Sequence, residues 1–252
     1  MKVTFLGTCH GYPEKNRDYT SIAIETAGRV YLLDAGASVT AKACNYEIDL
    51  ASLKSVFITH IHADHINGLV GLVDLMTWPK IYKDVTVDYY LPEARGIKEI
   101  KELVGVVSGP VDDNKNRFHV YEKDFVYDDG FLKLTVIPTH HLDDWGGYPA
   151  YAFFVECEGK KILFSGDLSQ NLKYEDFPRV AKTEELDLFI CEMAHFDFEV
   201  LRPHFKECKT KKLYMTHVKF PDERIPLLDG ENKSGEFLFP IVGANDGDVI
   251  EL

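Results

Sequence analysis

The residues best able to do chemistry in this sequence lie within one stretch of six, His60-Ile61-His62-Ala63-Asp64-His65. This stretch follows the apolar run 56–58, which indicates a buried strand. Because alternate residues of an extended segment share a face, we expect His60 and His62 to bind one metal ion together. Three imidazoles and a carboxylate are too dense for ordinary surface histidines, so metal binding is the favoured interpretation.

A helix is expected to begin just beyond this stretch, near Gly68, because Leu69 and Leu72 start an apolar pattern with helical spacing. Asp64 and His65 would then precede the helix and face a second ion. Imidazole and carboxylate ligands suit zinc, and also manganese or iron. The sequence therefore predicts two divalent metal ions, with zinc favoured and the element left open.

The stretch and its surroundings resemble the metallo-β-lactamase superfamily, and its ribonuclease Z-like branch in particular. Outside the histidine-rich stretch, the resemblance rests on Leu6-Gly7-Thr8, Gly11, Pro13, Arg17, Ser21 and Asp34-Ala35-Gly36. It implies an α+β fold, a four-layer αβ/βα sandwich with the metals at one edge of the sheets. It also implies that Asp34 supports the metal-binding loop by orienting a histidine, the alternative being a helix N-cap.

Later motifs supply the remaining ligands that the resemblance implies. Family spacing after Pro138 favours His141 as a ligand, with His140 as the alternative. Asp167 is the expected bridging carboxylate, because its two oxygens can bind two ions. His217 matches the last ligand of the family. The implied arrangement is one ion on His60, His62 and His141, a second on Asp64, His65 and His217, and Asp167 between them.

This ligand set implies hydrolysis. Two cations lower the pKa of a bridging water, supply hydroxide as the nucleophile and neutralise charge on a phosphoryl or carbonyl oxygen. Asp64 could accept a proton as well as bind metal. In the ribonuclease Z family a Glu and a downstream His protonate the leaving group. Glu192 matches this Glu, while His195 and His204 are alternative partners, so the implied catalytic residues are Asp64, Glu192 and His195.

The substrate is predicted from the connections between strands and from the charge. The tRNA-gripping arm of ribonuclease Z follows a strand that here begins near Tyr151, yet this sequence has only a tight Glu158-Gly159 turn there. A net charge of −13 disfavours nucleic-acid partners. We therefore expect a phosphodiesterase that acts on a small phosphodiester, such as a cyclic nucleotide or another small phosphodiester. The alternatives are a ribonuclease Z-type tRNA 3′ endonuclease, a lactonase or thioesterase and, least favoured, a non-enzymatic metal-binding module.

The rest of the sequence indicates a globular protein. A length of 252 residues and a hydrophobic content of 45% favour one domain over residues 1–252. No segment resembles a signal peptide or a membrane span, so we expect a cytoplasmic protein without a membrane partner. The five cysteines form no Cys-x-x-Cys motif and are expected to be reduced thiols. The oligomeric state is left open, and a homodimer is compatible with the sequence.

Three local features are also expected. Ala27-Gly28 should be the hairpin turn between strands at 21–26 and 30–34. The helix after Gly68 should end near Trp78-Pro79. The segments 237–242 and 249–252 are expected to form a closing hairpin, because Asp246-Gly247 is a typical turn sequence.

Overall fold

A computed structural model describes residues 1–77, 82–122 and 124–252 of the chain. The chain folds into two compact units, each interrupted in sequence. Unit 1 consists of residues 1–7, 15–123 and 246–251, and unit 2 of residues 8–14, 124–245 and 252. The single domain over residues 1–252 stays a prediction.

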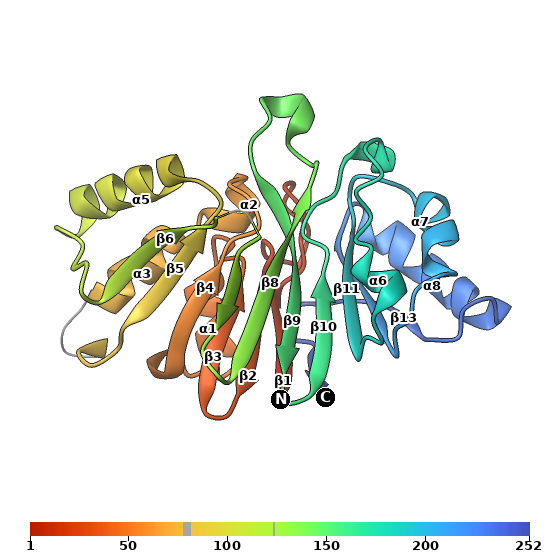
Figure 1. Ribbon diagram of the computed structural model, residues 1–252, viewed down its shortest axis with the longest axis horizontal. Helices are drawn as coiled ribbons and strands as arrows, with labels where there is room; N and C mark the ends of the chain where they lie inside the picture. Colours follow the sequence, from red (N-terminus) through yellow and green to blue (C-terminus); the bar gives the residue numbers. More distant parts are fainter. Residues whose placement is uncertain (78–81, 123) are drawn as a thin grey trace. The chain divides into compact units, whose positions relative to one another are not determined.

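Unit 1 contains a mixed sheet of seven strands in the order β14-β1-β2-β3-β4-β5-β6 (Figure 1). Its strands are β1 Lys2–Gly7, β2 Ser21–Thr26, β3 Arg29–Leu33, β4 Leu53–Phe57, β5 Val87–Leu91, β6 Asn116–Val120 and β14 Val249–Glu251. The pairs from β14 to β3 are antiparallel and those from β3 to β6 are parallel. The hairpin turn between β2 and β3 is Ala27-Gly28, as expected, with φ values of 47° and 71° that suit a tight two-residue turn.

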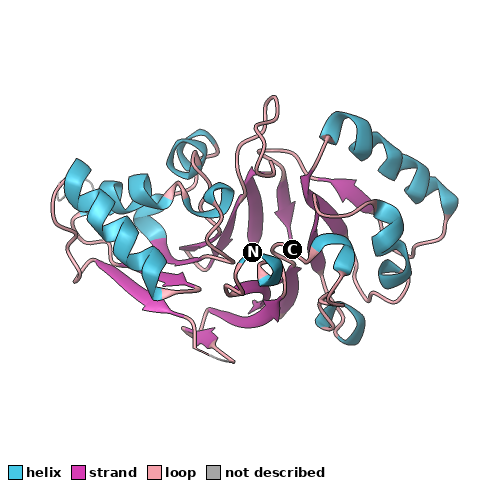
Figure 2. Cartoon of the chain, turned by 90° about the horizontal axis from the view of Figure 1, so that it is seen from above, coloured by secondary structure: helices cyan, strands magenta, loops and turns pink. Residues whose placement is uncertain are grey.

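Helices lie on one face of this sheet (Figure 2). They are α1 Val39–Asn45, α2 Ala63–Ile66, α3 Leu69–Thr77 and α5 Ala94–Val107, with a 3-10 turn at Leu50–Ser52. Helix α3 begins where the sequence predicted and buries Leu69, Leu72, Val73 and Met76 against the sheet. The predicted helix end near Trp78-Pro79 lies outside the described residues.

Unit 2 contains a second mixed sheet of seven strands, in the order β13-β12-β11-β10-β9-β8-β7. Its strands are β7 Val126–Asp128, β8 Leu132–Thr139, β9 Ala150–Cys157, β10 Lys160–Phe164, β11 Leu188–Met193, β12 Leu213–Val218 and β13 Ile241–Gly243. Its helices are α6 Val180–Thr183, α7 Phe198–Phe205 and α8 Pro221–Ser234, with 3-10 turns at Asp143–Trp145 and Gln170–Leu172. Apolar side chains of α6, α7 and α8 pack into one buried cluster with the strands.

The predicted closing hairpin is wrong. Strand β13 pairs in parallel with β12 in the sheet of unit 2, whereas β14 pairs antiparallel with β1 in the sheet of unit 1. The physical reason is that each segment covers the open edge of a different sheet, where unpaired backbone groups need partners. A turn sequence such as Asp246-Gly247 reverses the chain but does not choose the strand that follows as its partner.

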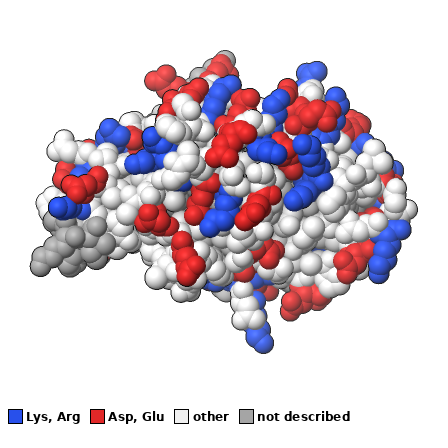
Figure 3. Space-filling model, turned by 90° about the horizontal axis from the view of Figure 1, so that it is seen from below, with Lys and Arg blue, Asp and Glu red and all other residues white. Residues whose placement is uncertain are grey.

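The surface charges are mixed. On the face that Figure 3 shows, Lys and Arg side chains are interspersed with Asp and Glu, so the described residues of that face form no continuous basic strip. Ion pairs account for several lysines of unit 2, including Lys133 with Glu156 at 2.8 Å and Lys161 with Glu184 at 2.6 Å. Among the described residues, no helix has both the length and the apolar character needed to cross a bilayer.

Candidate metal centre

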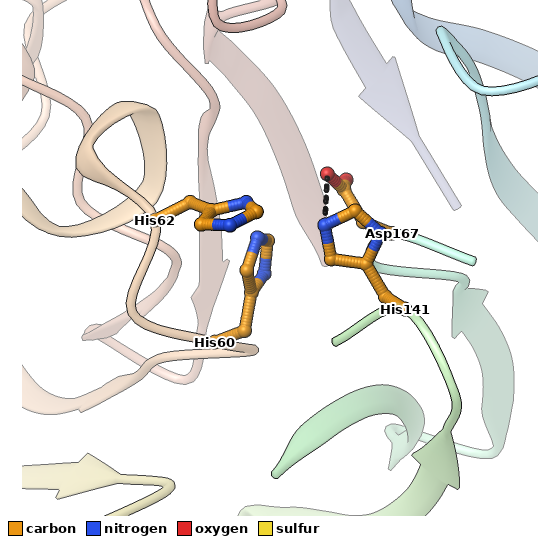
Figure 4. Close-up of side chains that lie close together, drawn as sticks. All are labelled: His60, His62, His141 and Asp167. Atoms are coloured by element: carbon orange, nitrogen blue, oxygen red, sulfur yellow. Dashed lines mark ion pairs between the residues drawn. The ribbon is translucent and has the colours of Figure 1, made fainter. Parts of the chain in front are cut away.

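The histidine-rich stretch directly follows β4 in unit 1. His60 and His65 are fully buried, and their ring centroids lie 4.2 Å apart. The rings of His60 and His62 lie 4.7 Å apart and extend from the loop after the strand (Figure 4). Asp64 and His65 belong to the short helix α2. The structure therefore brings the four predicted donors of this unit together.

A buried carboxylate orients two of these histidines. Asp34 lies directly after β3, and its Oδ2 accepts a hydrogen bond from His65 Nδ1 at 2.7 Å. Its Oδ1 accepts from the backbone N–H of Thr59 at 2.8 Å, and Thr59 Oγ1 lies 3.1 Å from His60 Nδ1. A ring that carries its proton on Nδ1 keeps the lone pair of Nε2 for a metal ion.

Asp34 therefore orients a histidine, as the resemblance implied, and the N-cap residue of α1 is Ser38 instead. Burial raises the pKa of the Asp34 carboxyl, and this effect outweighs the opposing effects of His65 and Thr59. The contacts with His65 and Thr59 favour the ionised form against this effect of burial.

Close packing of two loops holds this network in place. Gly68, which precedes α3, donates its backbone N–H to the carbonyl of Ala35 at 2.9 Å. A Cβ atom at Gly68 would lie only 2.1 Å from the carbonyl oxygen of Gly36. Only glycine permits this contact, which keeps the loop after β3 against the start of the helix.

In unit 2, three imidazoles converge on one carboxylate. Asp167 follows β10, and its Oδ2 lies 3.3 Å from His217 Nε2, 3.7 Å from His141 Nε2 and 4.0 Å from His195 Nδ1. Figure 4 shows the contact between His141 and Asp167. Each residue follows, or lies at the end of, a different strand of the sheet. The sheet thus gathers donors that are far apart in sequence.

The structure distinguishes between the two adjacent histidines after β8. His141 is buried and donates from Nδ1 to the carbonyl oxygen of Leu168 at 3.1 Å, which directs Nε2 towards Asp167. His140 is exposed and pairs with Asp143 at 2.9 Å. Burial lowers the pKa of His141, although Asp167 opposes this shift, so the ring favours the neutral form that binds metal. His141, rather than His140, occupies the position expected of a ligand.

The spacing of these donors fits a metal ion better than direct hydrogen bonds. Two atoms that each lie about 2.0–2.1 Å from one tetrahedral ion are roughly 3.3 Å apart. The pairs from His217 and His141 to Asp167, at 3.3 and 3.7 Å, are close to this value. In unit 1, His65 Nε2 lies 3.5 Å from Asp64 Oδ2. Both donor sets are therefore chemically and geometrically suited to divalent cations.

The structure identifies the partner of Glu192. The side chain of Glu192 is buried, and its Oε1 lies 2.8 Å from His195 Nδ1. Its Oε2 accepts a hydrogen bond from the backbone N–H of Ala194 at 2.7 Å. The alternative, His204, instead stacks on Phe177 with ring centroids 4.6 Å apart. His195 is therefore the histidine that Glu192 holds.

Arg224 on α8 braces the loop that carries His195. Its guanidinium donates to the carbonyl of Met193 at 2.6 Å and to that of Phe196 at 2.5 Å. Burial lowers the pKa of this guanidinium, opposed chiefly by Asp197. No sequence pattern pointed to this role, because an arginine on a helix is normally a solvated surface residue.

Curated relatives are ribonucleases. Ribonuclease Z of Methanocaldococcus jannaschii is 26% identical over 232 residues, covering 91% of this chain and 68% of the relative. Ribonuclease Z of Archaeoglobus fulgidus is 24% identical over 288 residues, covering 92% of each. The chain spans about half the length of other relatives. For example, it covers 45% of the ribonuclease Z of Methanothermobacter thermautotrophicus, at 31% identity over 141 residues.

Solved structures share the fold over the whole chain. The metallo-β-lactamase fold protein YhfI from Bacillus subtilis has a TM-score of 0.76 at 20% identity, covering 100% of this chain and 99% of the other. The short form of human tRNase Z (ELAC1) has a TM-score of 0.69 at 22% identity, with coverage of 100% and 99%. A diphosphatase of the PhnP family has a TM-score of 0.70 at 18% identity, covering 100% of this chain and 97% of the other. The predicted α+β metallo-β-lactamase fold is confirmed.

These relatives also confirm the predicted class, a metal-dependent hydrolase of the ribonuclease Z-like branch of the superfamily. A narrower family is shown by a sequence model described as "Anti-Pycsar protein Apyc1", which matches residues 1–223. The chain belongs to the Anti-Pycsar protein Apyc1 family.

Proposed function

We propose that this protein is a phosphodiesterase that hydrolyses a small, cyclic phosphodiester with the help of two divalent metal ions. The observation that carries the proposal is the convergence of the imidazoles of His141, His195 and His217 on one buried oxygen of Asp167. Such an arrangement has no evident use in folding, because burying charged and polar groups is costly without a compensating partner.

Seven side chains are the proposed ligands. His60, His62 and His141 would hold one ion, Asp64, His65 and His217 would hold the other, and Asp167 would serve as the shared carboxylate. The ligand types and the orienting bonds to Asp34, Thr59 and Leu168 support this assignment.

The proposed mechanism divides the proton transfers between two sets of residues. A pair of divalent ions, when bound, lowers the pKa of water and offsets negative charge on a phosphoryl group. In this proposal Asp64, whose Oδ2 lies 3.5 Å from His65 Nε2, accepts a proton. His195, which Glu192 holds through Nδ1, can deliver a proton to the departing oxygen. Glu192 fixes the direction of the His195 ring through this contact.

The small substrate is supported by the hairpin between β9 and β10. These strands are joined by Glu158-Gly159 alone, with φ values of 49° and 73° that are typical of a two-residue turn. No arm is inserted at this point of the described chain. The acidic net charge of −13 also opposes long-range attraction of a polyanion.

A second candidate is tRNA 3′-end processing. It is favoured by the relatives, since those that cover most of this chain are ribonucleases Z. A nuclease of this kind should cleave precursor tRNA most efficiently at low salt, because contacts with phosphates weaken as the salt concentration rises.

A substrate panel distinguishes these functions. The metal-loaded protein is offered bis-p-nitrophenyl phosphate, 3′,5′-cyclic nucleotides, a lactone, a thioester and precursor tRNA. We expect turnover of the cyclic nucleotides and of the p-nitrophenyl diester, and neither acyl cleavage nor cleavage of tRNA at physiological salt. Efficient tRNA cleavage would favour the second candidate, and turnover of only the acyl substrates would contradict both.

A further inference from the structure

A buried carboxylate that is not among the proposed ligands lies close to them in unit 2. Asp176 follows the 3-10 turn Gln170–Leu172 and is only 8% exposed. Its Oδ2 accepts hydrogen bonds from the backbone N–H groups of His140 and Ser169, each at 2.9 Å. Its Oδ1 accepts from the hydroxyl of Ser169 at 2.6 Å. One side chain therefore joins two separate loops.

These two loops carry proposed ligands. His140 directly precedes His141, and Ser169 directly follows Leu168, whose carbonyl accepts the hydrogen bond from His141 Nδ1. Asp167 lies two residues before Ser169 in the same loop. Asp176 thus holds together the backbone on both sides of the contact between His141 and Asp167.

We propose that Asp176 is a positioning residue that sets the distance between His141 and Asp167. The inference rests on the proposed function, since it assumes that these two residues bind metal. Without Asp176, two buried backbone N–H groups lose their acceptor and the loops can separate. The 3.7 Å spacing of the two donors depends on that connection, and metal affinity depends on the spacing.

The hydrogen bonds define which substitution should be tolerated. An asparagine at position 176 can place its carbonyl oxygen where Oδ2 accepts from both N–H groups. Its NH2 group can donate to the Ser169 hydroxyl, which is able to accept as well as donate. Positioning should therefore survive Asp176→Asn and fail in Asp176→Ala. A metal ligand or a proton carrier would not tolerate either change, because an amide replaces neither function.

Asp187 offers a matched control in the same unit. It is also 8% exposed, accepts a hydrogen bond from the backbone N–H of Lys161 at 3.0 Å and pairs with Lys211 at 2.8 Å. It directly precedes β11, whereas Glu192 lies near the other end of that strand. Asp187→Ala should lower the free energy of unfolding without moving the metal-binding side chains.

The experiment measures zinc affinity by competition with a chromophoric chelator, on full-length variants whose folding is checked by circular dichroism. We expect Asp176→Ala to weaken zinc binding by about 10- to 100-fold, the usual effect of losing a residue that orients ligands. Asp176→Asn and Asp187→Ala should stay within about threefold of the wild type. Ser169→Ala removes the hydroxyl contacts with Asp176 and with the backbone N–H of Tyr174 but keeps both backbone N–H bonds to Asp176, so it should weaken binding by a smaller factor than Asp176→Ala.

Several results would overturn the inference. Equal losses of zinc affinity in Asp176→Asn and Asp176→Ala would show that the negative charge of Asp176 matters, rather than its hydrogen bonds to the two loops. A similar loss of zinc affinity in Asp187→Ala would show that lower stability of the fold is enough to weaken zinc binding. If Asp176→Ala does not fold, unchanged affinity in Ser169→Ala contradicts the role. Wild-type protein that binds no zinc would overturn the proposed function as well, whereas zinc binding that is equal in wild type and Asp176→Ala would overturn this inference alone.

Discussion

The two units assemble their donors in opposite ways. In unit 1, His60, His62, Asp64 and His65 are nearly contiguous, and a single buried carboxylate, Asp34, orients the group. In unit 2, the donors come from the ends of different strands and depend on bonds between loops. The contrast teaches that ligands close together in sequence can be oriented by one buried side chain. Ligands that are far apart in sequence need several orienting residues, which we call supports.

The supports of unit 2 are correspondingly numerous. Glu192 holds His195, Arg224 braces the loop around it, and Asp176 joins the loops that carry His141 and Asp167. Arg224 lies on a helix far along the chain from the loop that it holds, whereas Asp176 links its own loop to the loop after β8. Substitutions in the two units should therefore differ in how sharply their effects are localised.

The largest effect is expected from the ligands themselves. His60→Ala and Asp167→Ala should each lower kcat/KM for a phosphodiester by about a thousandfold or more, since losing an ion removes several kcal/mol of charge stabilisation. Steady-state kinetics and metal analysis check this. Exposed His140 supplies the control, and His140→Ala should keep most activity. If only one of the two variants were impaired, the unimpaired residue would not be a ligand that hydrolysis needs.

The next effect concerns His195 and depends on the leaving group. His195→Ala should lower the rate by about a hundredfold for a cyclic nucleotide, whose alkoxide leaving group needs a proton. The rate for bis-p-nitrophenyl phosphate should change little, because p-nitrophenolate leaves readily without one. The two substrates are compared on the same metal-loaded variant. Equal losses on both would argue against proton donation by His195.

A smaller effect, a loss of metal affinity, is expected on substitution of Asp34. Unlike Asp176, Asp34 should not tolerate asparagine. Asp34→Ala should weaken metal binding by about 10- to 100-fold. Asp34→Asn should be as harmful, because an amide that keeps the bonds with Thr59 would turn its NH2 group towards His65 Nδ1 and shift the ring proton to Nε2. Chelator competition measures both variants. Full zinc affinity in Asp34→Asn would contradict the proposed orientation of His65.

The smallest effect is expected from Arg224. Arg224→Lys keeps the charge but loses the fork that reaches two carbonyl groups. We expect a free energy of unfolding lower by about 1 kcal/mol, in line with the loss of a hydrogen bond. Denaturant titration measures this, and hydrolysis of the cyclic substrate should fall severalfold while zinc affinity is kept. Loss of zinc affinity instead would show that Arg224 supports the ligands directly.

Some of this site could be predicted from the sequence, for physical reasons that differ between the units. The stretch from His60 to His65 was recognisable because ligands that are close in sequence are necessarily close in space. The sequence favoured His141 over His140 from family spacing and named His195 as a catalytic residue with His204 as the alternative, whereas the contacts that distinguish each pair, with Leu168 and with Glu192, are visible only in the structure. These contacts depend on tertiary structure.

The elements of the fold could also be predicted only where residues close in sequence determine them. Hairpins joined by tight turns, such as that at Ala27-Gly28, and the start of α3 were predicted, because local residues determine them. The separation of β13 and β14 into different sheets was missed, since the available sheet edges decide the pairing. Asp176 could not be singled out in the sequence, because its role depends on contact with the backbone N–H of His140, which is distant along the chain.

The most direct test of the account is the metal stoichiometry of the purified, reloaded protein. Mass-spectrometric metal analysis after removal of loosely bound ions should find two divalent ions per wild-type chain and fewer in Asp167→Ala. Wild-type protein that holds no stoichiometric metal under any loading condition, or an Asp167→Ala variant that retains two ions, would contradict the claim that the protein binds two metal ions with Asp167 as a ligand.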